Sequence, residues 1–193
     1  MAALLVAAST LAGCAVLGGG AKPLDTYELT APVPSTKGRR LRHRQIIVAE
    51  PSALKALDGE NIVIRASNTS LQYLDGAQWA DRLPKIVQAR LVEAFQRSGR
   101  LGGTGKPGEG LAVDYQVIAN ISAFEIRVDN GEHAYVAITA RLLDDRNGVV
   151  RSTREFEAGS PVGSGGNDAY VAALDQAFGQ VAGDLVNWAL SRM

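Results

Sequence analysis

The chain has 193 residues, of which 46% are hydrophobic and 21% charged, and its 20 lysines and arginines balance 20 aspartates and glutamates. This length and composition predict one folded domain with a buried core. The zero net charge argues against nucleic acid as the main partner, because duplex-binding proteins usually carry a basic excess. The single cysteine excludes an internal disulfide framework and multi-cysteine metal sites. No apolar stretch reaches the length of a membrane-spanning helix.

The N-terminus carries a processing signal. Residues 1–13 are uncharged and apolar and end in small residues, which is typical of a signal peptide that is removed from the mature protein. The tetrapeptide Leu11-Ala12-Gly13-Cys14 resembles the bacterial lipobox, and this resemblance implies cleavage before Cys14 and acylation of that cysteine by fatty acids such as palmitate. Ala15 follows it, which by resemblance to enteric lipoproteins favours the outer membrane over the inner one. The alternative is a free cysteine in an apolar helix.

Residues 14–44 are predicted to be a lipidated flexible tether, since they contain a glycine triplet and several prolines. Within this tether, residues 26–30 alternate in polarity and could form an edge strand. Residues 37–44 form a basic run that could contact anionic lipid headgroups or an acidic partner. The alternative is a solvated entrance to the following strand, which the neutral chain as a whole favours.

Residues 45–193 are predicted to form the folded domain, and its first half alternates short strands with one helix. Strands are predicted at residues 45–50, 62–64 and 71–74 because these stretches are β-branched or apolar and end at turn signals. Apolar residues then recur every three or four positions over residues 78–98, which predicts an amphipathic helix. Pro84 is tolerated if this helix begins near Arg82.

From Leu111 the apolar period changes to two, which predicts a long strand over residues 111–128. Its phase reverses after Ile121, indicating a bulge near Ala123. The pairs Asn130-Gly131 and Asn147-Gly148 predict tight type I′ turns, so that residues 111–157 form a three-stranded antiparallel meander.

A C-terminal helix is predicted over residues 167–190 with a narrow apolar seam. The seam consists of Val171, Leu174, Phe178, Val181, Leu185 and Trp188. It could bind a partner helix as a coiled coil, but the sheet needs a cover. We therefore predict an α+β fold: a two-layer sandwich of a mainly antiparallel sheet covered by two long amphipathic helices.

The sequence offers little for catalysis. The two histidines, His43 and His133, have no metal-ligand spacing and no cysteine partner once Cys14 is acylated. The acidic pairs Asp144-Asp145 and Glu155/Glu157 lie on a predicted hairpin and an exposed strand face, so they form no shielded acid–base pair. The glycine-rich residues 99–110 lack the first glycine and the hydroxyl residue of a P-loop and are interpreted as a flexible loop. We predict no enzyme activity, no cofactor and no metal.

Two segments carry a resemblance to a known family. They are Thr26-Tyr27-Glu28-Leu29-Thr30-Ala31-Pro32 and Leu71-Gln72-Tyr73-Leu74-Asp75-Gly76-Ala77-Gln78-Trp79-Ala80-Asp81-Arg82-Leu83-Pro84, which runs into a helix. With the preceding lipobox, they resemble the ABC-type transport auxiliary lipoprotein component family, the PqiC-like partners of MCE lipid transporters. The similarity of layout covers almost the whole mature chain.

The resemblance implies a lipid-anchored periplasmic accessory subunit without chemistry of its own. Its partners would be an ABC permease and ATPase and an MCE-domain protein, in a system that moves phospholipids or other hydrophobic molecules between membranes. A different hypothesis is an outer-membrane lipoprotein that regulates cell-wall synthesis or envelope integrity, since such proteins share an anchor, a linker and a small α/β domain.

Two aromatic residues are candidate partner-binding residues. Tyr73 and Trp79 could serve as anchors for a partner, because buried aromatic side chains dominate many interfaces. The alternative is that they pack against the sheet at the helix entrance, and for Trp79 we favour this packing role.

Overall fold

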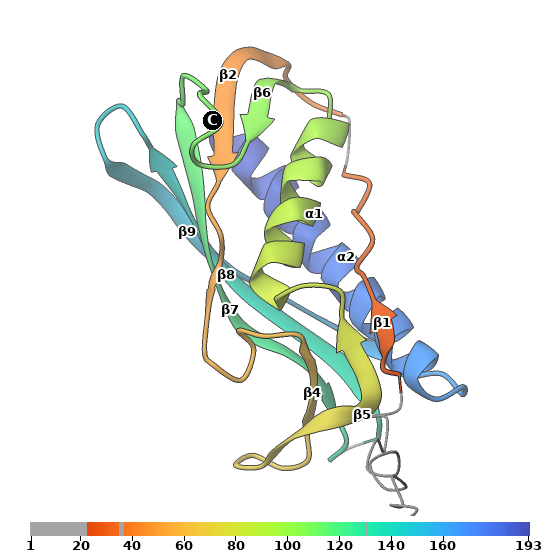
Figure 1. Cartoon of the computed structure of the whole chain (residues 1–193). Helices are drawn as coiled ribbons and strands as arrows, with labels where there is room; N and C mark the ends of the chain where they lie inside the picture. The colour runs from red at the N-terminus through yellow and green to blue at the C-terminus, as the bar shows by residue number, and fades with distance from the viewer. Residues whose placement is uncertain (1–22, 35–36, 130) are drawn as a thin grey trace, which may run out of the picture.

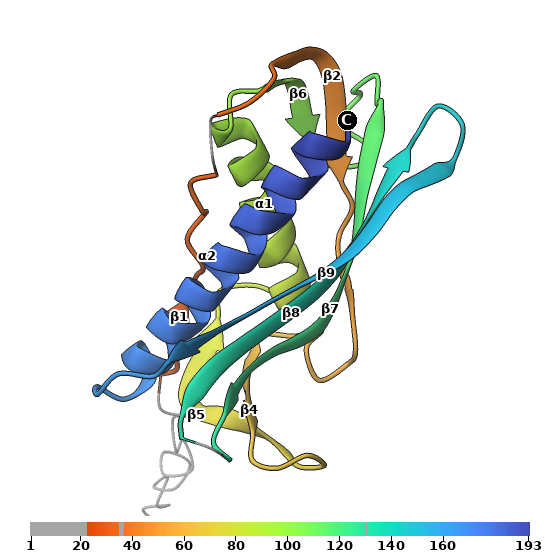
Figure 2. The same cartoon turned by 180° about the vertical axis from the view of Figure 1, so that it is seen from behind.

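The computed structural model describes residues 23–34, 37–129 and 131–193. Within these residues the fold is α+β, as predicted: a mixed sheet of nine strands carries two helices on one face (Figures 1 and 2). The predicted signal peptide, Cys14 and the first part of the predicted tether lie outside the described residues. Neither described helix is long and apolar enough to cross a membrane.

The C-terminal half of the sheet is the predicted antiparallel meander. It consists of β7 (Tyr115–Arg127), β8 (His133–Asp144) and β9 (Val149–Pro161). The register of β7 shifts between Ile121 and Ala123, as the phase reversal predicts. The bulge turns Phe124 and Ile126 into the core, where both are buried.

The other side of β7 is paired in parallel, so the sheet is mixed, although most of its paired residues are antiparallel. Three consecutive strands run along it in order: β2 (Leu41–Val48), β3 (Ser52–Ala53) and β4 (Asn61–Arg65). One stretch of chain thus follows the whole length of β7 in the same direction. From β4 the sheet continues, antiparallel, to β5 (Leu71–Trp79), which pairs in parallel with β1 (Asp25–Tyr27) at the edge.

Part of the segment predicted as a tether packs against the domain. The predicted edge strand is present as β1, and Leu29 beyond it is 1% exposed. The Tyr27 hydroxyl donates a hydrogen bond to Asp168 at 2.6 Å, which raises the pKa of Tyr27 to about 12. The backbone nitrogen and hydroxyl of Thr30 both donate to Asp175, at 2.7 Å.

Two predictions about local structure are wrong for strands β2 and β6 (Leu101–Gly105), which lie at the upper end of the molecule in Figure 1. Strand β2 begins at Leu41 rather than at residue 45, so half of the basic run belongs to the sheet. The glycine-rich segment predicted as a loop contains β6, which pairs in parallel with β2. Glycine has a low strand propensity, and the pairing with β2 overrides it.

The first helix, α1 (Leu83–Arg97), begins later than residue 78 because β5 continues through Trp79. Pro84 lies in its first turn, as predicted. The second helix, α2 (Asn167–Arg192), lies along β8 and β9 and buries every residue of the predicted seam. The seam therefore covers the sheet instead of binding a partner helix.

Aromatic side chains form the centre of the core between the helices and the sheet. Trp79 meets Phe124 edge-to-face with ring centroids 5.8 Å apart, and Phe124 meets Phe178 at 6.0 Å. Phe156 and Trp188 form a second edge-to-face pair at 5.4 Å. Such pairs add about 0.5–1.5 kcal/mol beyond the burial of their area.

The β8–β9 hairpin differs from the predicted two-residue turn. Asp144 pairs with Val149, so four residues form the loop, and only Gly148 among them has a positive φ, of 71°. The Asn147 side chain accepts a hydrogen bond from the backbone nitrogen of Val149 at 3.0 Å, which is the local bonding that favours asparagine in turns. Asn130 of the other predicted turn lies outside the described residues.

Candidate docking groove beside helix α1

The structure separates the two candidate partner-binding residues. Trp79 is 1% exposed in the aromatic core, so its side chain offers no surface to a partner in this conformation. Tyr73 lies at the start of the same strand, β5, and is 53% exposed. Only Tyr73 remains an exposed candidate.

The two histidines lie on different strands. His43 is exposed on β2, and His133 begins β8 with its Nδ1 2.8 Å from the carbonyl oxygen of Gly131. In the part of the chain that the structure describes, no group of three or more histidine, cysteine, aspartate or glutamate side chains is arranged to hold a metal ion.

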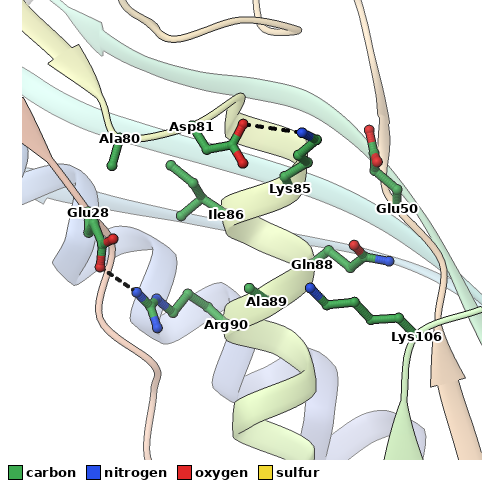
Figure 3. A pocket seen from close by; sticks show the side chains of 10 residues that line it. All are labelled: Glu28, Glu50, Ala80, Asp81, Lys85, Ile86, Gln88, Ala89, Arg90 and Lys106. Atoms are coloured by element: carbon green, nitrogen blue, oxygen red, sulfur yellow. Dashed lines mark hydrogen bonds and ion pairs between the residues drawn. The ribbon is translucent and has the colours of Figure 1, made fainter. Parts of the chain in front are cut away.

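An open groove of about 520 Å³ lies beside α1 (Figure 3). Six of its lining residues are charged, three of each sign: Glu28, Glu50, Asp81, Lys85, Arg90 and Lys106. Three of its lining residues are apolar, and two of these are alanines: Ala80, Ile86 and Ala89. The groove therefore offers an open surface with both signs of charge.

Helix α1 and the turn before it supply one wall of the groove. Asp81, Lys85 and Ala89 follow one another at four-residue spacing, which places them on one side of the helix. The Lys85 ammonium lies 3.5 Å from the Asp81 carboxylate. The pKa of Asp81 is lowered, chiefly because its carboxylate accepts a hydrogen bond from the backbone nitrogen of Arg82 and also because Lys85 is near.

Residues distant in sequence supply the rest of the groove. Glu28, which follows β1, accepts a hydrogen bond from Arg90 at 2.7 Å (Figure 3). Glu50 follows β2 and pairs with Arg82 at 3.0 Å. Lys106 follows β6, and its ammonium group makes no ion pair among the described residues. The groove thus holds both paired and unpaired charges at an open surface.

Sequence reasoning missed this groove. The spacing of Asp81 and Lys85 on a predicted helix is the one local signal for its wall. Glu28 falls in the segment predicted as a tether and Lys106 in the segment predicted as a loop, and their approach to α1 follows only from the pairing of β1 and β6 with the sheet.

A model of the ABC-type transport auxiliary lipoprotein component family matches residues 27–186, from the end of β1 into α2. The chain belongs to this family. Its members are named as an auxiliary component of transport and not as an enzyme class. The match confirms the resemblance stated above, and it covers every strand from β2 onward together with α1 and most of α2.

Two solved structures share the fold of this chain. The crystal structure of protein XCC0632 from Xanthomonas campestris is 28% identical and has a TM-score of 0.77, over 86% of this chain and 95% of that one. A second crystal structure, of an uncharacterized protein, has a TM-score of 0.68 at 19% identity, over 86% of this chain and 99% of that one, and shares the fold.

One curated relative is the uncharacterized protein bll6063 from Bradyrhizobium diazoefficiens. It is 28% identical over 180 residues, which are 92% of this chain and 48% of that protein. The chain therefore spans about half the length of this curated relative.

Proposed function

We propose that this protein is the accessory subunit of an MCE-type ABC transport system that moves phospholipids or other hydrophobic molecules between the inner and outer membranes. It is anchored through acylated Cys14 on the periplasmic side of the outer membrane. It acts by docking to the permease, the ATPase complex or the MCE-domain protein, without chemistry of its own. The observation that carries this proposal is the family match over residues 27–186.

The geometry supports docking more than the carriage of a lipid inside the domain. A carrier needs an enclosed apolar cavity for the acyl chains. The space between the sheet and the helices is instead filled by large buried side chains, among them Trp79, Phe124 and Phe178. The groove beside α1 is open and lined by charges, which suits a polar protein surface.

The charged residues of the groove allow the proposed docking to be tested by mutation. Lys106 has no ion-pair partner among the described residues, and Lys85 reaches only one carboxylate, at 3.5 Å. Both ammonium groups can therefore pair with carboxylates of a partner. Complementary charges at an interface set its specificity and association rate, and like charges placed together cost several kcal/mol.

The double variant Lys85→Glu/Lys106→Glu is expected to bind its transport partners at least about tenfold more weakly, since a loss of about 1.4 kcal/mol already gives that factor. The measurement is capture of the tagged full-length protein from its own membranes in mild detergent, with quantification of permease, ATPase and MCE-domain subunits. The matched control Lys55→Glu/Arg141→Glu makes the same change of charge at exposed positions outside the groove.

The two variants separate the possible results. Equal losses in both would overturn docking at the groove, because they would indicate a general effect of charge. Recovery of the intact wild-type protein with a cell-wall synthase, and with none of the transport subunits, would overturn the proposed function itself.

The Cys14→Ser variant is expected to lose its covalent membrane anchor. Two or more acyl chains hold a protein on a membrane, since each buried CH₂ contributes about 0.8 kcal/mol. Mass spectrometry of the intact wild-type protein should find the acyl groups on an N-terminal Cys14, and the variant should lack them and leave the membrane fraction on alkaline washing. A wild-type protein that begins at Met1 and carries no acyl group would contradict the anchor.

A further inference from the structure

Strand register brings two arginines together at the lower end of the molecule in Figure 1. The parallel pairing of β4 and β7 places Arg65 opposite Arg127, and the antiparallel pairing of β4 and β5 places Leu71 opposite Arg65. Leu71, Arg65 and Arg127 thus lie side by side on β5, β4 and β7. They lie at the ends of these strands, beside the β4–β5 and β7–β8 hairpins. Arg65 and Arg127 therefore share one side of the sheet at an open end.

A buried carboxylate holds both guanidinium groups. Glu125, two residues before Arg127 on the same side of β7, is 1% exposed, and its Oε1 accepts a hydrogen bond from Arg65 Nε at 2.6 Å and from Arg127 Nε at 3.0 Å. The Arg127 guanidinium also lies 3.6 Å from the ring centroid of Tyr135. One negative charge thus orients two positive charges, and this cluster of three keeps a net charge of +1.

Both arginines line a cleft. Both arginines use Nε toward Glu125, and Arg65 Nη1 makes one long contact, of 3.5 Å, to the carbonyl oxygen of Asn68. The cleft has a volume of about 350 Å³ and is lined by Arg65, Asn68, Arg127 and Asp129. Guanidinium groups held in this way suit the oxygens of a phosphate, because their planar N–H groups match its geometry.

Exposed apolar side chains lie close to the cleft residues in register or in sequence. Leu71 is 41% exposed beside Arg65, Tyr73 is 53% exposed two residues further along β5, and Val128 directly after Arg127 is 37% exposed. Arginine side chains with exposed apolar and aromatic side chains near them are the composition of a surface that enters the headgroup region of a bilayer.

The start of the described chain lies at the same end of the molecule. Strand β1 runs upward from the lower part of the molecule in both Figures 1 and 2, and Asp25 pairs with Ala77, six residues further along β5 than Leu71. Nine residue steps join Cys14 to Pro23, which span at most about 32 Å. Acylation at Cys14 would therefore keep this end of the domain close to the membrane surface.

We propose that the cleft between Arg65 and Arg127 binds the phosphate of an anionic phospholipid headgroup at the membrane surface. Leu71, Tyr73 and Val128 enter the interface around it. The proposal rests on the proposed function for the presence of a nearby membrane. Asp129 also lines the cleft, and its negative charge lowers the affinity for an anion. Replacing Asp129 with a neutral residue should therefore increase binding to anionic lipid.

The test uses the full chain with Cys14→Ser, so that no acyl group contributes, and vesicles of phosphatidylcholine with or without phosphatidylglycerol. Co-flotation measures the partition. Arg65→Gln and Arg127→Gln should each lower the partition onto anionic vesicles about fivefold, and Asp129→Asn should raise it by a similar factor, because one charge near an anionic surface has about this effect. Arg141→Gln on β8 is the matched control and should change it little.

Removal of either arginine leaves Glu125 with one partner, so thermal unfolding of each variant checks that it folds. If Arg65→Gln and Arg127→Gln both unfold, Asp129→Asn alone decides, because it removes no contact of the cluster. The proposed binding at the cleft would be overturned if Arg141→Gln lowered the partition onto anionic vesicles equally, or if Asp129→Asn did not raise it. Inorganic phosphate that protects the protein from unfolding, with no difference between the two vesicle types, would overturn the lipid assignment. The readout uses no transport subunits, so its failure leaves the co-purification result unaffected.

Discussion

Replacing Trp79 with alanine is expected to lower the free energy of unfolding by about 3–5 kcal/mol. The indole is 1% exposed and meets Phe124 edge-to-face at 5.8 Å, at the junction of β5, β7 and α1. Truncation removes its buried apolar area and leaves a cavity that the surrounding helices and strands fill only in part. Domains of this size are stable by only about 5–15 kcal/mol in total, so the loss is a large fraction.

The measurement is equilibrium unfolding in urea, with circular dichroism as the probe and an unchanged m-value as the check for two-state behaviour. Tyr73→Ala is the matched control on the same strand. It removes an aromatic ring that is 53% exposed, and it should change stability by no more than about 0.5 kcal/mol. If Trp79→Ala were as mild as Tyr73→Ala, the placement of Trp79 in the core would be wrong.

Replacing Gly102 with alanine is expected to destabilise the protein by about 1–3 kcal/mol and to loosen the pairing of β6 with β2. A Cβ atom at this position would lie 2.1 Å from the carbonyl oxygen of Arg42 and 2.9 Å from its carbonyl carbon. Both are backbone atoms of the neighbouring strand, which cannot rotate away as a side chain can. The two strands must therefore separate to accept the methyl group.

Gly103→Ala tests whether the effect is specific. The nearest atoms to a Cβ there belong to the side chain of Gln45, at 3.2 Å and beyond, and that side chain can move. The loss of stability should be clearly smaller than in Gly102→Ala. Hydrogen exchange of the β2 and β6 amides, together with urea unfolding, measures both variants. Equal stability of Gly102→Ala and the wild type would contradict the close approach of the two strands.

The spacing of apolar residues predicted which side of an individual strand or helix faces the core. The bulge after Ile121 follows from a reversal of the apolar phase within one strand, and the seam of α2 follows from three-and-four spacing. Both patterns record which side of an element faces the core, and that side is the same whatever the element packs against.

Strand order was not predictable in the same way. Residues 45–65 carry no pattern that distinguishes parallel from antiparallel pairing, so the order of β2, β3 and β4 along one side of β7 was missed. Strand β6 was missed because three of its five residues are glycine, which predicts a loop when neighbours are unknown. In the fold these glycines permit the close approach to β2.

The candidate sites show the same division. The family resemblance rested on two short segments, and the match over residues 27–186 agrees with it. The groove beside α1 joins Glu28, Glu50, Lys85 and Lys106 from four separate segments, and no local pattern links them. The cleft of Arg65 and Arg127 likewise depends on the register between β4 and β7.

By itself the sequence of this neutral chain with one cysteine determined the α+β fold class, and it predicted acylation of Cys14 as the one piece of covalent chemistry. These conclusions depend on composition, local motifs and apolar period, which are properties of neighbouring residues. Only the tertiary structure decided that Trp79 is buried, that part of the predicted tether packs onto the domain, and which charges meet at its surface. Such contacts join residues far apart in the chain, and strand pairing and core packing place them together.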